Sequence, residues 1–152
     1  MTKQELLDLN DALMAVGGLT GVKFAYAVAK NVNIIKDEIN AIKKAVEFSP
    51  EYRKFETERI KEAIAFAKKT PKGETMIADG KYIFENPKEW EKKFEEIKKK
   101  YKKAFDAREK QLDEFEKLLQ EDVEVNLFLI GQEQLPAEIK TSELTGIFKI
   151  IK

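Results

Sequence analysis

Acidic side chains recur along one stretch of the chain, at Glu47, Glu51, Glu58 and Glu62. Glu58 and Glu62 share one helical face at i, i+4 spacing, and di-metal helical bundles hold their ions with glutamates placed in this way. Those bundles add Glu-x-x-His ligands, and this chain contains no histidine. We therefore interpret the four glutamates as a solvated, charged helix face.

The chain also lacks cysteine, and the two absences together exclude several classes of chemistry. Tetrahedral Cys/His zinc sites, Ser-His-Asp and Cys-His catalysis all need one of these side chains. The usual ligands of haem and of iron–sulfur clusters are missing for the same reason. Carboxylate, lysine, tyrosine or Mg²⁺ chemistry remains open, and no constellation of such residues points to it. We predict a non-enzymatic protein without a cofactor or a metal.

Two glycine-containing motifs have a structural interpretation as well as a chemical one. Asp79-Gly80-Lys81, with Glu85 nearby, has an Asp-x-Lys spacing that Mg²⁺-dependent nucleases use, but Asp-Gly is ordinary turn chemistry. Gly17-Gly18 and Thr20-Gly21 precede a predicted helix, where a glycine-rich turn could hold phosphate. Neither the P-loop nor the dinucleotide pattern is present. We interpret both motifs as turns.

The densest positive charge lies in 98–103, where five lysines surround Tyr101. Such a face could contact phosphates, and Lys98, Lys99 and Lys102 are its candidate contacts. The chain as a whole carries 28 basic and 28 acidic residues, so it is not a general polyanion binder. Nucleic-acid association is therefore the alternative hypothesis, and a solvated face is the simpler one.

An apolar C-terminal segment, 122–152, is the more promising surface. It carries several large side chains for which a narrow helical hairpin offers little cover. Either these side chains cover the end of the hairpin, or they form a surface for a protein partner. The candidate contact residues are Phe128, Ile130, Leu135, Ile147 and Phe148.

Apolar periodicity and capping residues place the elements. We predict helices over 3–16, 22–48, 50–69 and 87–120, with Ser49-Pro50 and Asn86-Pro87 as N-cap and first helical residue of two of them. One kinked helix over 22–69 remains an alternative. Two β-prone runs around Asp79-Gly80 predict a small hairpin over 74–84. The segment 123–130 resembles a strand, and Thr141 or Ser142 could cap a short final helix.

These elements predict a mainly α fold in a single domain, 1–152. Its core, 22–120, is a long, coiled-coil-like antiparallel helical hairpin with the β-hairpin at the connection. A short helix precedes this core, and a strand and short helix follow it. The steps of four residues from Ile97 to Tyr101 to Phe105 indicate a stutter, although we expect an uninterrupted helix there. The apolar side chains at the a and d heptad positions of such helices can be buried within one chain or between two chains, so homo-oligomers remain possible.

The order of features resembles a family of short, uncharacterised proteins encoded in tailed-phage and prophage genomes. The resemblance covers most of the chain with loose motifs, at 21–31, Glu56 with Arg59, 73–82, 123–125 and Leu135-Pro136. It implies a phage context and no activity, because the family has no established catalytic residues to carry over.

We expect an interaction protein that binds a protein partner through the helical hairpin and the C-terminal segment. No apolar run reaches the 18 or so residues of a membrane span, and the first residues do not resemble a signal peptide. We therefore expect a cytoplasmic protein, in the host cytoplasm if it is viral, without a membrane partner.

Overall fold

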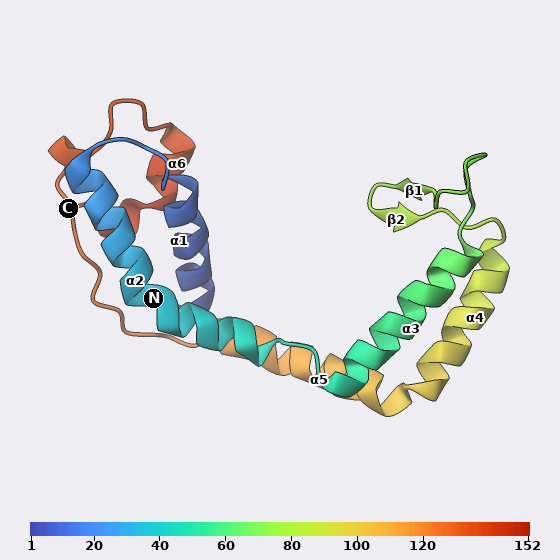
Figure 1. Ribbon diagram of the computed structural model, residues 1–152. Coiled ribbons are helices and arrows are strands. Elements are labelled where there is room, and N and C mark those ends of the chain that lie inside the picture. The colour runs from blue at the N-terminus through green and yellow to red at the C-terminus, as the bar shows by residue number, and fades with distance from the viewer. The chain divides into compact units, whose positions relative to one another are not determined.

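The computed structural model describes residues 1–152 and is mainly helical, with one small two-stranded antiparallel sheet (Figure 1). Contacts gather in two compact units, Met1–Glu47 with Glu114–Lys152 and Phe48–Asp113. The single domain over 1–152 stays a prediction. The elements are α1 (Lys3–Ala15), α2 (Val22–Ala45), α3 (Pro50–Phe66), β1 (Ile77–Ala78), β2 (Lys81–Tyr82), α4 (Pro87–Lys100), α5 (Lys102–Leu119), η1 (Gln132–Gln134), α6 (Thr141–Gly146) and η2 (Phe148–Ile150), where η marks a 3-10 helix.

The first unit is built on α1 and α2, which pack side by side. Thr2 and Glu5 form a capping box that satisfies backbone N–H groups at the start of α1. The predicted apolar stripe of α1 is buried, and α2 buries a matching stripe. The fully or nearly buried side chains of these two helices are Leu6, Leu9, Leu13, Phe24, Ala27, Val28, Asn31, Ile35, Ile39 and Ile42.

Residues of the C-terminal segment are part of this core. The short helix α6 packs on α1, and Ile147 and Ile150 are fully buried. The predicted cap at Thr141 or Ser142 is wrong by one or two residues. Thr141 is already the first residue of α6, and the N–H of the preceding Lys140 donates to the Glu143 carboxylate.

The predicted strand over 123–130 is wrong, because this segment belongs to no sheet. It follows α5 as a chain without helix and has only isolated bridges near its ends, Thr2 with Asp122 and Ile130 with Ile151. The segment contains the β-prone residues Val123, Val125, Phe128 and Ile130. No second strand lies beside them to complete a ladder.

The second unit contains α3 and α4, and both begin at the predicted N-cap and proline pairs. The Ser49 hydroxyl accepts from the N–H of Tyr52, and the Asn86 side chain accepts from that of Glu89. Contacts between the helices are antiparallel in order: Glu58 meets Lys100, Glu62 meets Lys93, and Phe66 meets Trp90.

The predicted uninterrupted helix over 87–120 is wrong. The chain leaves helical geometry at Tyr101, where φ is −108° and ψ is 25°, and α4 and α5 lie on either side. The break falls at the sequence stutter, where two successive four-residue steps carry the apolar stripe around a straight helix. There the rings of Phe94, Tyr101 and Phe105 all contact Phe55.

The β-hairpin is confirmed and shorter than predicted, with Ile77 paired with Tyr82 and Ala78 with Lys81. Asp79 and Gly80 have φ values of 50° and 72°, the left-handed pair that a type I′ turn requires. The hairpin packs against the end of α3, since Lys68 exchanges backbone hydrogen bonds with Ile83 and Met76.

The longer hairpin over 22–120 stays a prediction. Glu121 forms an ion pair with Lys3 of α1 at 2.7 Å. No helix is both long and apolar enough to cross a membrane.

Candidate functional site

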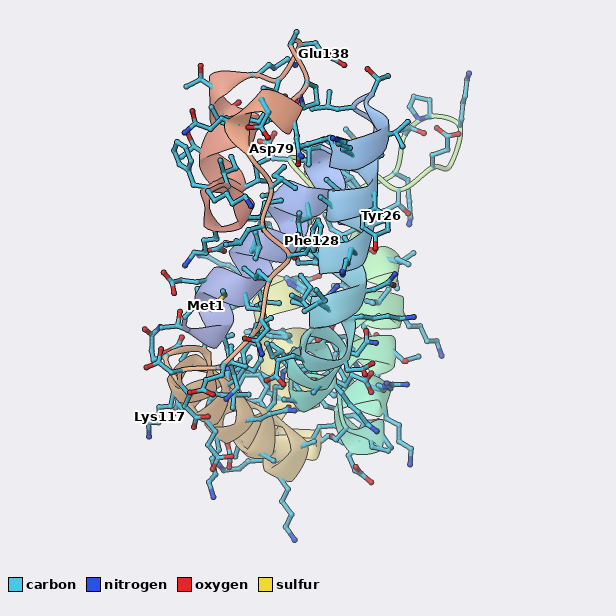
Figure 2. All side chains as sticks on the ribbon, turned by 90° about the vertical axis from the view of Figure 1, so that its left-hand side faces the viewer. Met1, Tyr26, Asp79, Lys117, Phe128 and Glu138 are labelled. Atoms are coloured by element: carbon cyan, nitrogen blue, oxygen red, sulfur yellow. The ribbon has the colours of Figure 1, made fainter.

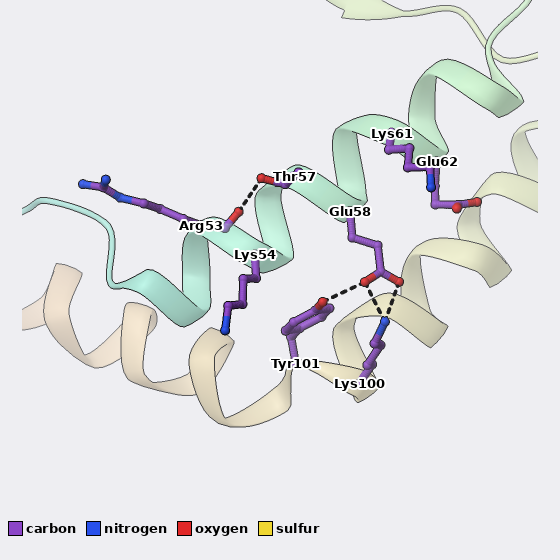
Figure 3. A pocket seen from close by; sticks show the side chains of 8 residues that line it. All are labelled: Arg53, Lys54, Thr57, Glu58, Lys61, Glu62, Lys100 and Tyr101. Carbon is purple, nitrogen blue, oxygen red and sulfur yellow. Dashed lines mark hydrogen bonds and ion pairs between the residues drawn. The ribbon is translucent and has the colours of Figure 1, made fainter.

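An open groove of about 580 Å³ lies in the second unit (Figure 3). It contains two of the four glutamates predicted to form a charged face, and four cations join them. The lining residues are Arg53, Lys54, Thr57, Glu58, Lys61, Glu62, Lys100 and Tyr101.

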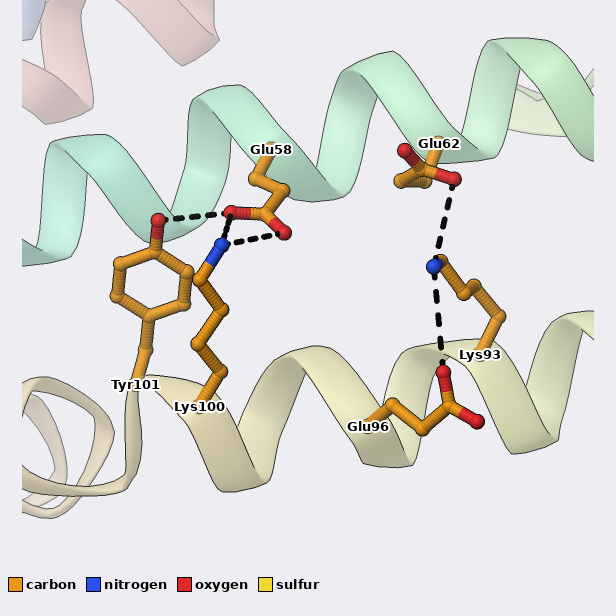
Figure 4. Close-up of polar contacts among 6 residues, drawn as sticks. All are labelled: Glu58, Glu62, Lys93, Glu96, Lys100 and Tyr101. Atoms are coloured by element: carbon orange, nitrogen blue, oxygen red, sulfur yellow. Dashed lines mark hydrogen bonds and ion pairs between the residues drawn. The ribbon is translucent and has the colours of Figure 1, made fainter.

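Glu58 is the most constrained side chain of this groove. Its carboxylate accepts hydrogen bonds from Lys100 Nζ at 2.7 Å and from the Tyr101 hydroxyl at 2.7 Å (Figure 4). The Lys100 ammonium, followed by the Tyr101 hydroxyl, holds the pKa of Glu58 below its ordinary value. The same contact raises the pKa of Tyr101. Glu58 is therefore ionised at neutral pH and poorly suited to general-acid catalysis.

The second glutamate of the groove also faces a lysine on α4. Lys93 Nζ lies 3.8 Å from a carboxylate oxygen of Glu62 and 3.9 Å from one of Glu96 (Figure 4). No group of three or more acidic side chains is placed to hold a metal ion. Glu58 and Glu62 each form an ion pair with a lysine of α4. The i, i+4 spacing that is also found in di-metal bundles therefore places two carboxylates at the contact between α3 and α4.

The basic run 98–103 is largely neutralised by its surroundings. Lys98 pairs with Glu95, Lys100 with Glu58 and Lys102 with Asp106. Lys98 also lies over the rings of Phe94 and Phe105. Lys99 and Lys103 are exposed and make no ion pair, so two cations remain for an anionic partner.

The two glycine motifs have the positions expected of turns. Asp79 and Gly80 form the hairpin turn, with Lys81 in β2 and Glu85 just beyond the hairpin. Gly17 and Gly18 lie in the turn after α1, and Gly21 precedes α2 with a φ of 114°. The Thr20 hydroxyl donates to the Glu138 carboxylate at 2.8 Å, which lowers the pKa of Glu138.

A buried amide fixes the C-terminal segment on α2. Asn31 is fully buried, and its Nδ2 donates to the carbonyl oxygen of Phe128 at 2.9 Å. The N–H of Phe128 donates in return to Asn31 Oδ1 at 2.8 Å. Asn31 thus satisfies both backbone groups of Phe128, and its Nδ2 also donates to the carbonyl of Ala27. No polar group of Asn31 is left unpaired inside the core.

Large apolar side chains remain exposed beside this anchor. The Tyr26 and Phe128 side chains lie next to each other (Figure 2), and their rings meet edge to face at 5.7 Å. Lys30 Nζ lies 4.3 Å from the centre of the Phe128 ring. Leu129 is 47% exposed and Tyr26 is 58% exposed. A shallow groove of about 430 Å³ on α2 includes Tyr26, Lys30 and Ile34. We define the α2–tail surface as Val22, Tyr26, Lys30, Ile34, Phe128 and Leu129.

The five apolar candidates of the C-terminal segment have different environments. Ile130 and Ile147 are fully buried in the first unit, so they are core residues. Leu135 and Phe128 are half-buried and pack against that core. Phe148 is 59% exposed. Most of the segment covers α1 and α2, and only part of it is available to a partner.

Sequence reasoning missed Asn31, Tyr26 and Lys30. A signal for Asn31 was present, because a polar residue stands on the buried face of α2 between Ala27 and Ile35. No local signal identifies Phe128 as its partner, 97 residues away in the sequence.

Comparison with known protein families, curated proteins and solved structures finds no match, so the resemblance to short phage proteins stays a prediction.

Proposed function

We propose that this chain is a non-enzymatic interaction protein that binds a partner polypeptide through the α2–tail surface. The observation that carries the proposal is an exposed aromatic and aliphatic surface built on a fixed backbone. Tyr26 and Leu129 are about half exposed, while the buried Asn31 amide holds the backbone of Phe128, the residue before Leu129, on α2. Exposed apolar side chains on a rigid base are typical of protein-binding surfaces.

The side-chain types of the surface support the same proposal. Tyrosine and phenylalanine gain large contact areas at a small cost in conformational entropy, and tyrosine is frequent among binding hot spots. Lys30 adds a cation at the rim, already placed over Tyr26 and Phe128. Val22 is 90% exposed one helical turn before Tyr26, so the apolar surface continues along α2.

The wider context is part of the proposal. We propose that 22–120 forms the predicted hairpin and presents the α2–tail surface in the cytoplasm, and that the chain is phage-encoded. The proposal needs no catalytic residue, cofactor or metal, and the two carboxylates of the groove, Glu58 and Glu62, are used in contacts between α3 and α4.

Affinity capture from the native host tests the proposal, with the full chain as bait. Deletion of 123–152 is unsuitable because Ile130, Ile147 and Ile150 belong to the core. We expect the double variant Tyr26→Ser with Leu129→Ser to lose the captured protein. Ile77→Ser is the matched control, since Ile77 is as exposed as Tyr26 but lies on the β-hairpin. Identical capture by the wild type and the double variant would contradict the proposal.

The alternative proposal, a nucleic-acid-associated protein, rests on Lys99 and Lys103 alone. They are four residues apart across the α4–α5 break and lack acidic partners. Binding to DNA or RNA that weakens steeply with salt and is lost on Lys99→Glu with Lys103→Glu supports this alternative. Binding that persists in this double variant excludes it.

A further inference from the structure

The backbone of 124–129 is almost free of hydrogen bonds within the protein. Among these residues only Phe128 has its N–H and carbonyl groups paired, and both pair with Asn31. The backbone groups of Glu124, Val125, Asn126, Leu127 and Leu129 have no protein partner. A row of unpaired backbone donors and acceptors is the property that makes the edge of a sheet attract another strand.

Both ends of this segment are fixed. The N–H of Val123 donates to the carbonyl of Met1 at 2.8 Å, next to the bridge between Thr2 and Asp122. At the other end, the N–H of Ile130 donates to the carbonyl of Ile150 at 2.8 Å. Figure 2 shows the segment between them passing along α2, with Met1 near its start and Phe128 beside Tyr26.

Burial alternates over 123–127 as it does in a strand with one covered face, and the alternation ends at Phe128, which is half-buried like Leu127. Val123, Val125 and Leu127 are half-buried, whereas Glu124 and Asn126 are exposed. This period of two is the pattern that led the sequence to predict a strand over 123–130. The part 123–127 therefore has the side-chain pattern of a strand without a neighbouring strand, and Phe128 is turned towards Tyr26 and Asn31 of α2.

We propose that 124–129 receives an extended segment of a partner polypeptide as an added β-strand. This inference rests on the proposed function and names the kind of element that the partner supplies. Backbone hydrogen bonds would supply most of the affinity. Leu129 and Tyr26 would select apolar side chains on the added strand, because they are the exposed apolar groups beside it.

An extended segment fits these groups better than a helix does. In a helix the backbone N–H and carbonyl groups pair with one another, apart from the last turns, so a docked helix leaves those of 124–129 unpaired. A second copy of this chain could offer its own 124–129 segment, and the experiment separates that case.

The probe is a set of short peptides selected from a random library against the full chain. Amide hydrogen exchange is then followed by NMR, residue by residue, with and without peptide. We expect exchange at alternate residues of 124–129 to slow by about tenfold or more, because in a strand alternate backbone groups point to opposite edges.

N-methylated versions of the same peptides supply a second measurement that leaves the protein unchanged. Methyl groups on one alternating set of peptide amides should lower the affinity by about tenfold or more, and methyl groups on the other set should have little effect. Only a peptide bound as a strand shows this difference between the two sets.

The other outcomes are distinct. Peptides that bind as helices, leave exchange unchanged along 124–129 and lose affinity on Leu129→Ser overturn the added strand but support the proposed function. Alternating protection that grows with protein concentration without peptide identifies a second copy and overturns the partner strand. If the library yields no peptide whose affinity is lowered by Leu129→Ser, that result contradicts both the inference and the proposed function.

Discussion

The two units use different interactions to hold similar helices together. In the first unit, a continuous cluster of thirteen buried, mostly aliphatic residues lies between α1, α2 and the C-terminal segment. In the second, only Phe55, Ala63, Ala67 and Ile97 are buried. Aromatic rings in contact around Phe55 and around Trp90, together with ion pairs between α3 and α4, take the place of an aliphatic core.

The difference predicts that the stability of the second unit depends more on salt and pH than that of the first. Burial of aliphatic side chains depends little on salt or pH. Exposed ion pairs weaken when salt is added and when acid protonates their carboxylates. The second unit also concentrates its stability in few residues, so single substitutions there should have large effects. Trp90, the only tryptophan, lies in the second unit and reports on that unit alone.

The largest expected effect is that of Phe55→Ala. Phe55 contacts the rings of Tyr52, Phe94, Tyr101 and Phe105, so truncation leaves a cavity where α3, α4 and α5 meet. We expect a loss of about 3–5 kcal/mol in the free energy of unfolding, measured by urea titration with Trp90 fluorescence. A loss under about 1 kcal/mol would show that the rings do not form the core of the second unit.

Leu9→Ala tests the first unit in the same way. Leu9 is almost fully buried between α1 and α2, and its truncation should cost about 2–5 kcal/mol. The loss should appear in the circular dichroism of helices and leave the transition of Trp90 in place. If the Trp90 transition moves by the same amount, the two units unfold together and the comparison fails.

Asn31→Ala sharpens the comparison, because the first unit also contains one buried polar contact. The substitution leaves the N–H and carbonyl of Phe128 unpaired, which should cost about 1–3 kcal/mol. Asn33→Ala is the control, since Asn33 is exposed on the same helix and should change stability by no more than about 0.5 kcal/mol. Urea titration of both variants gives the difference, and equal values would remove the role assigned to Asn31.

Acid should have the smallest effect, and it acts through Glu58. The folded-state pKa of Glu58 lies below its unfolded value, so its contribution is present above the unfolded pKa and is lost as pH falls through the folded one. We expect the thermal midpoint from Trp90 to fall as pH drops below about 4.3. Glu58→Gln should flatten this dependence. An unchanged pH profile in that variant would assign the acid sensitivity to other carboxylates.

Acid should also affect the first unit, and the probe separates the two effects. The pKa of Glu5 is lowered mainly by the hydrogen bond from Lys149, and that of Glu138 by the hydroxyl of Thr20. Both contacts lie at the rim of the aliphatic core. Trp90 does not report on them, because it lies in the other unit.

Local chemistry made several features predictable from the sequence. The caps at Ser49-Pro50 and Asn86-Pro87 depend on neighbouring residues alone, and so does the turn at Asp79-Gly80. The mainly helical fold with a small hairpin followed from these signals and from apolar periodicity.

Features that depend on distant partners could not be predicted. The break at Tyr101 contains no proline or glycine, and it brings the Tyr101 hydroxyl to Glu58, 43 residues away in the sequence. The segment 123–130 has the composition of a strand, but a strand also needs a neighbour that the sequence cannot supply by itself. Of the candidate contact residues, Ile130 and Ile147 are buried in one cluster with residues of α1 and α2, and no local pattern in the sequence reveals these distant neighbours.

The connection between the two units has a mechanical consequence. Residues 1 and 152 both lie in the first unit, and the second unit is inserted between the two segments that form it. Tension applied between these residues first loads the short backbone contacts of Met1 with Val123 and of Lys152 with Ile130. Tension cannot reach Phe48–Asp113 until the first unit opens, so in a single-molecule pulling experiment connectivity, and not thermodynamic stability, sets the order of rupture.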